Sequence, residues 1–90
     1  NMRTMKVFVL TSMMRANEDT ELKVVGVYST KTQAKEKLAE WKRATIEHFE
    51  DNDPNDYMVC DDAPTIFGIT CNNKDKWSEL QVTEKVIDND

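Results

Sequence analysis

The chain has 90 residues, of which 39% are hydrophobic and 32% charged, and a formal net charge of −5. This length supports a single domain over residues 1–90 with one modest core, and it is too short for an enzyme with separate cofactor and substrate lobes. The longest apolar run, Val7–Leu10, is far below the roughly 20 residues that cross a bilayer, so we expect a cytoplasmic protein with no membrane partner. Asn1 precedes a methionine, and we expect the natural start at Met2 or Met5.

Two apolar runs near the N-terminus predict an antiparallel hairpin. Lys6–Thr11 is short, β-branched and aromatic, and a polar segment separates it from Leu22–Tyr28. Gly26 indicates a bulge or a close backbone approach. Both runs are apolar on both faces, as in a sheet that is covered on both sides. One helix covers only one side, so the other side requires the C-terminal segments or another chain, and we predict a homodimer.

The next segment predicts an amphipathic helix near residues 30–50. Thr30 is suited to cap the first turn, with Gln33 reaching back as in a capping box. The apolar stripe that should face the sheet consists of Ala34, Leu38, Trp41, Thr45 and Phe49, with Ile46 beside them. We expect Trp41 in the core.

Pro54 ends the helical pattern, and the remaining chain predicts strands. Residues 57–60 are a short extended piece, Thr65–Cys71 is a stronger strand, and Leu80–Ile87 forms a final strand, with a short helix over residues 77–80 as an alternative. The predicted fold is α+β, in the order ββαββ, an antiparallel sheet with one main amphipathic helix packed on one face.

Charge is distributed unevenly along the chain. Residues 44–73 contain no Lys or Arg, and the helix places Lys31 and Lys35 near its start but Glu47 and Glu50 at its end, against the helix dipole. Such an acidic field repels nucleic acid and attracts a basic surface, so we expect a protein partner of that kind and no direct nucleic-acid binding. The candidate partner-binding residues are Glu47, Glu50, Asp51, Asp53, Asp56, Asp61 and Asp62, together with Trp77 at a rim or interface.

The acidic segment also has part of a calcium-loop pattern. Asp51-x-Asp53-x-Asn55 supplies closely spaced oxygen ligands, but Asp56 stands where the loop requires Gly, and Asp62 stands where a bidentate Glu is usual. We therefore predict no metal site and no cofactor. A small-ligand or divalent-metal-binding regulator that uses the 51–62 acidic loop is the alternative function.

The residues that carry most enzyme chemistry are few and scattered. His48 is the only histidine, Cys60 and Cys71 form no CxxC motif, and the two glycines make no phosphate-binding loop. We predict no catalytic residues and a protein that is not an enzyme.

Four short stretches carry a resemblance to other proteins: Lys6–Thr11, Val24–Thr30, Ala34–Leu38 and Trp77. Through them the chain resembles small standalone bacterial and phage proteins of uncharacterised function, which implies a compact α+β domain and transfers no activity. Together with the acidic stretch, the sequence predicts a non-enzymatic interaction or regulatory protein that binds another macromolecule through an acidic surface. A specific form of this prediction is a phage-type inhibitor that imitates nucleic-acid phosphate.

Overall fold

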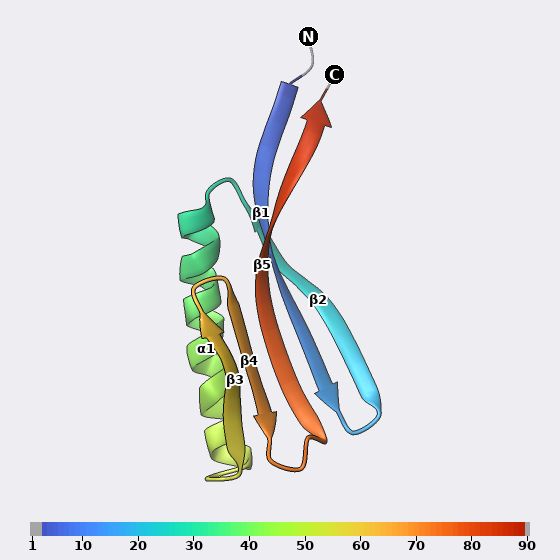
Figure 1. The fold of residues 1–90 in the computed structure, drawn as a ribbon, viewed down its shortest axis with the longest axis vertical. Helices are drawn as coiled ribbons and strands as arrows, with labels where there is room; N and C mark the ends of the chain where they lie inside the picture. The colour runs from blue at the N-terminus through green and yellow to red at the C-terminus, as the bar shows by residue number, and fades with distance from the viewer. Residues whose placement is uncertain (1–2, 90) are drawn as a thin grey trace.

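The computed structural model describes residues 3–89 as one helix packed on a five-stranded antiparallel sheet (Figure 1). In chain order the elements are β1 (Arg3–Ala16), β2 (Asp19–Tyr28), α1 (Lys31–Asn52), β3 (Tyr57–Ala63), β4 (Ile66–Cys71) and β5 (Lys76–Asn89). The strand order in the sheet is β2-β1-β5-β4-β3. The predicted α+β class with an antiparallel sheet is confirmed, but the order ββαββ is wrong by one strand because three strands follow the helix. The expected start at Met2 lies outside the described residues.

The start of α1 is held by its predicted cap. The Thr30 Oγ1 accepts a hydrogen bond from the Gln33 N–H at 3.2 Å, which satisfies one of the N–H groups left free in the first turn. The Gln33 side chain does not reach back to Thr30; its Oε1 accepts a hydrogen bond from the Ser29 hydroxyl instead. At the other end the Asp53 N–H donates to the Phe49 carbonyl, so the helix closes one residue before Pro54.

The core lies between α1 and one face of the sheet. Ala34, Leu38 and Phe49 are the buried residues of the helix, which packs on β5, β1, β2 and β4. Trp41 and Ile46 are partly buried against this core, as the apolar stripe predicted. The buried hydrophobic side chains from the strands are Leu10, Phe67, Ile69, Cys71 and Leu80.

A bulge in β2 divides its apolar residues between the two faces of the sheet. Leu10 pairs with Gly26 and Thr11 with Val24, so Val25 has no partner in β1. The extra residue allows Val25 to pack on the core while Val24 lies on the opposite face. The predicted bulge is therefore present beside Gly26. A close backbone approach is not what occupies the space at this glycine: a Cβ there would collide with the side-chain ring of Tyr28.

The C-terminal segments add three strands to the sheet and leave its second face uncovered. The strand β5 lies between β1 and β4 at the centre of the sheet, and β4 and β3 continue it to the edge. The alternative of a short helix over residues 77–80 is wrong, because β5 is already extended at Lys76. The sequence suggested that the C-terminal segments or another chain cover the second face of the sheet. Within the described residues, the C-terminal segments are strands of the sheet and do not cover that face.

The upper parts of β1 and β5 project beyond the rest of the molecule (Figure 1). Residues 3–7 pair only with residues 85–89, because β2 joins the sheet at Phe8 and β4 reaches only to Gln81. We call this two-stranded segment the ribbon. It makes the molecule 55 Å long, with a radius of gyration of 15.2 Å against about 12 Å for a compact chain of this size. In the part of the chain that the structure describes, no helix is long and apolar enough to cross a membrane.

Candidate functional site

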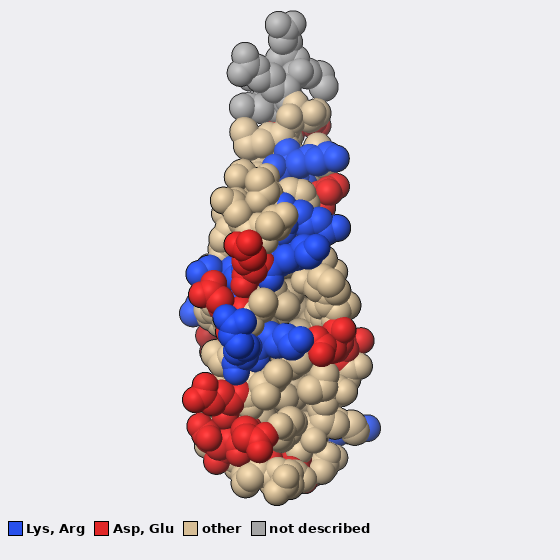
Figure 2. All heavy atoms as spheres, turned by 90° about the vertical axis from the view of Figure 1, so that its left-hand side faces the viewer, with Lys and Arg blue, Asp and Glu red and all other residues tan. Residues whose placement is uncertain are grey.

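The seven acidic candidate residues do not form one loop. Glu47, Glu50 and Asp51 lie on the last turns of α1, and Asp53 caps its end. Asp56 directly precedes β3, and Asp61 and Asp62 lie within this strand. Figure 2 shows acidic side chains gathered toward the lower end of the molecule, with Lys and Arg side chains above them. The charge order against the helix dipole is confirmed, because α1 has no acidic residue in its first turn and no basic residue in its last.

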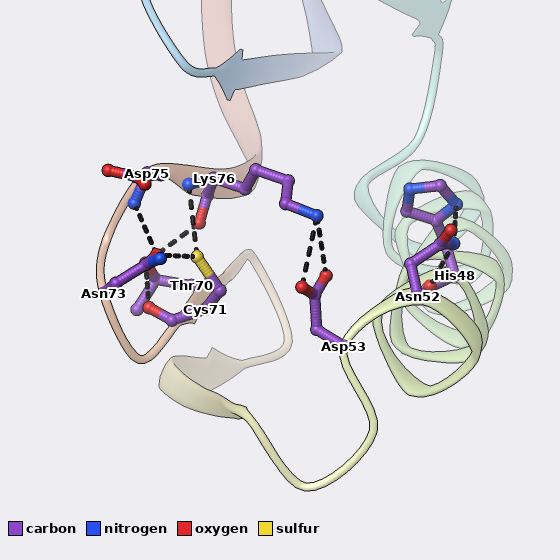
Figure 3. A network of polar contacts seen from close by, with 8 residues as sticks. All are labelled: His48, Asn52, Asp53, Thr70, Cys71, Asn73, Asp75 and Lys76. Atoms are coloured by element: carbon purple, nitrogen blue, oxygen red, sulfur yellow. Dashed lines mark hydrogen bonds and ion pairs between the residues drawn. The ribbon is translucent and has the colours of Figure 1, made fainter.

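Asp53 is engaged in holding the fold together. Its two carboxylate oxygens accept hydrogen bonds from the Lys76 Nζ at 3.1 and 3.0 Å (Figure 3), and its side chain is only 16% exposed. This ion pair joins the end of α1 to the start of β5. Asp53 is therefore withdrawn from the surface that the sequence assigned to a partner.

The turn before Lys76 is fixed by a second set of polar contacts (Figure 3). The Asn73 Oδ1 accepts hydrogen bonds from the Cys71 thiol at 2.8 Å and from the Asp75 N–H at 3.1 Å. The Thr70 hydroxyl donates to the Lys76 carbonyl at 3.0 Å. These contacts hold the backbone of Lys76 in place. Its side chain can then extend to Asp53 at the end of α1.

Two further acidic candidates also have partners within the chain. The Asp62 carboxylate forms an ion pair with the Lys42 Nζ of α1, and Glu50 accepts a hydrogen bond from the Tyr57 hydroxyl. This hydrogen bond raises the pKa of Tyr57 above its ordinary value of 10.0, because the neutral phenol is the donor. Burial and the negative charge of Glu50 act in the same direction.

Four acidic candidates have neither an ion pair nor a side-chain hydrogen bond with the residues that the structure describes: Glu47, Asp51, Asp56 and Asp61. We call Glu47, Asp51 and Asp56 the acidic end, since they surround the end of α1; Asp61 lies on β3. Within residues 3–89, no three His, Cys, Asp or Glu side chains are placed so that they could hold a metal ion. The alternative function, a small-ligand or divalent-metal-binding regulator that uses the 51–62 acidic loop, stays a prediction.

The cysteines and the histidine lie on different elements. Cys60 is an exposed free thiol on β3, and Cys71 is a buried free thiol on β4. His48 lies on α1, where its ring contacts the side chain of Asn52 (Figure 3), and it lines a hollow of about 290 Å³ between the helix and the sheet. Neither cysteine is among the described residues that line this hollow.

The most extensive feature of the surface is the face of the sheet opposite α1. Because side chains alternate along a strand and paired residues share a face, the residues of this face follow from the register. We call it the helix-free face. Its apolar side chains are Met5, Val7, Val9, Met13, Leu22, Val24, Val27, Met58, Ile66, Trp77 and Ile87.

These side chains are exposed to a degree unusual for their type. Leu22, Val24 and Val27 are 64%, 60% and 59% exposed, and Met5, Met58 and Ile87 are about half exposed. Six of the nine large hydrophobic side chains that the structure leaves exposed therefore lie on this one face. The apolar side chains that β1 and β2 place on it adjoin one another, because Val9 pairs with Val27 and Met13 with Leu22. Monomeric soluble proteins rarely expose large apolar patches. The sequence indicated these side chains through strands that are apolar on both sides, but the site residues chosen from charge did not include them.

Two candidate residues belong to this face, Trp77 and Asp61. Trp77 is half-buried at the lower end of β5, paired with Arg15 on one side and Thr70 on the other. It lines a shallow hollow of about 390 Å³ together with Cys60, Asp61, Gly68 and Glu79. The predicted place of Trp77 at a rim fits this position, and its contact with a partner stays a prediction.

On β5, the helix-free face carries two opposite charges that stand in no ion pair with the described residues. Lys85 lies opposite Val7 in the upper half, and Glu79 lies opposite Met13 in the lower half. Neither forms an ion pair within residues 3–89. Between Glu79 and Lys85, the β5 residues that face outward are Gln81 and Thr83, which are polar and uncharged.

Comparison with known families places the chain in one of them. Residues 5–81 match the family described as a domain of unknown function, DUF7336, and the chain therefore belongs to this family. The match covers α1 and the strands β2, β3 and β4 in full. The search of curated proteins and the search of solved structures both return no significant match.

Proposed function

We propose that this protein works by binding another protein chain, without catalysis, and that the helix-free face is its binding surface. The observation that carries the proposal is the concentration of exposed apolar side chains on one face of a sheet whose other face packs against α1. Antiparallel sheets with one wet face normally alternate apolar and polar residues, and this one does not. Covering such a face removes apolar surface from water, which is the main driving force of protein association.

The test places a photo-crosslinking benzophenone side chain at Val24, which is exposed on the part of the helix-free face formed by the edge strand β2, and activates it in cells. The matched control carries the same group at Glu36, which is exposed on α1. We expect a crosslinked product of defined mass from position 24 and none of that mass from position 36. No product from position 24, or the same products from both positions, would show that this face is not the binding surface.

A second candidate surface is the acidic end, which supports the sequence-based proposal of a partner with a basic surface. Its three side chains are exposed, outside any ion pair with the described residues, and lie on the last two turns of α1 and just before β3. In the inhibitor form of this proposal, the acidic end of a phage-type protein occupies a basic groove that otherwise holds nucleic acid.

An oligolysine peptide serves as the probe for this second surface. We expect its affinity to fall about tenfold or more between low and physiological salt, because the attraction between exposed charges is screened. Replacing Asp51 and Asp56 with Asn should weaken the binding, whereas the matched pair Glu18→Gln and Glu21→Gln on the β1–β2 hairpin should leave it unchanged. Equal effects of the two pairs would mean that the peptide responds only to net charge.

A further inference from the structure

We infer that the chain covering the helix-free face is a second copy of this protein, related by a two-fold axis that crosses the strands at the Leu10–Val82 pair. This inference rests on the proposed function and names its partner. In such a dimer the two sheets pack face to face, with β5 of one copy antiparallel to β5 of the other and the two helices on the outside.

The size of the face suits a partner of the same size. The molecule measures 55 by 25 Å across the broad side seen in Figure 1, in which the strands lie side by side. That outline, which also includes α1, is on the order of 1,000 Å², so the helix-free face is similar in size to the ~800 Å² that each partner buries in a standard interface. A second sheet of the same length, turned end for end, covers β1 and β5 along their whole length, including the ribbon, whereas a short peptide or a single helix would leave part of these strands in water.

The charges on the outward side of β5 match those of a second copy in this orientation. Lys85 and Glu79 lie three residues on either side of Val82 along β5. A two-fold axis at Val82, perpendicular to the strands, therefore places Lys85 of each copy opposite Glu79 of the other. Two complementary pairs result, and no like charges meet on β5. If the axis ran along the strands instead, Lys85 would meet Lys85 and Glu79 would meet Glu79, and like charges repel.

The same axis provides a cover for the ribbon, which has the least support within one copy. Ile87 and Trp77 are five residues on either side of Val82, so Ile87 of one copy comes to the hollow beside Trp77 of the other. Met5 and Arg15 are related in the same way about Leu10, the partner of Val82 in β1. The apolar tip of each ribbon would thus leave water for the lower end of the partner's sheet, where Trp77 and Met13 lie.

The test measures the dissociation constant of the dimer by sedimentation equilibrium, with helix and sheet content checked by circular dichroism. We expect the wild type to show a mass near twice the 10.4 kDa of one chain. Lys85→Glu should raise the dissociation constant about tenfold or more, because both pairs become repulsive at once. The double variant Lys85→Glu/Glu79→Lys restores both pairs with reversed sign and should return to within about threefold of the wild type. Glu84→Lys is the matched control, because Glu84 pairs with Phe8 on the side of the sheet that faces α1.

Three results would overturn the inference. They are a wild type that stays monomeric, a double charge reversal that does not recover the dimer, and a Glu84→Lys variant that weakens it as much as Lys85→Glu. The proposed function is judged separately by the mass of the product crosslinked from Val24. A product with a different protein would retain the proposed function and overturn the dimer, whereas a product of two copies of the chain supports both.

Discussion

At the scale of single residues, Thr30 holds the start of α1 through one side-chain oxygen. Replacing Thr30 with Ala removes the acceptor of the Gln33 N–H, and we expect the free energy of unfolding to fall by about 1 kcal/mol. The measurement is urea denaturation at a fixed protein concentration. Thr30→Ser retains the oxygen and should lose only a small part of this stability. Equal losses in the two variants would show that the methyl group of Thr30 matters and its hydroxyl does not.

At the scale of elements, the charge order of α1 makes a prediction about its stability. Lys31 opens the helix, whose first turn contains no acidic residue, so its charge opposes the helix dipole. Lys31→Glu should therefore raise the free energy of unfolding by about 0.3–1 kcal/mol at low salt. Lys31→Gln should give a smaller gain, because it removes the unfavourable charge without adding a favourable one. The gains should shrink when urea denaturation is repeated in about 1 M salt; gains that persist there would contradict the electrostatic explanation.

The same elements show how far the sequence predicted the fold. The helix follows from local features, namely the Thr30 cap and an apolar stripe ending at Phe49, and it forms as predicted. The predicted fold contained one strand too few because β3 lacks strong local signals: Asp61 and Asp62 lie within it, and a bulge at Cys60 interrupts its register with β4. Its extended form is set by pairing with a strand that local propensity cannot reveal.

The candidate site shows a similar division between local and long-range information. The acidic residues were identified from composition, but their partners Lys42, Lys76 and Tyr57 come from other elements, and the sequence gives no sign of these contacts. The apolar pattern of the first two strands did indicate a second buried face. Only the central place of β5 in the sheet shows that the described chain leaves this face open.

At the scale of the whole molecule, the ribbon is the part whose stability depends most on a partner. Two isolated strands are marginally stable in water, and residues 3–7 and 85–89 have only each other for hydrogen bonding within the described chain. If the second copy covers the ribbon, hydrogen exchange of its amides should slow strongly between ~1 μM and ~500 μM protein, because association stabilises it by mass action. The Lys85→Glu variant should exchange rapidly at both concentrations. Ribbon amides that are equally protected in dilute and concentrated wild type would mean that the ribbon is stable on its own, and the main structural need for the dimer would be removed.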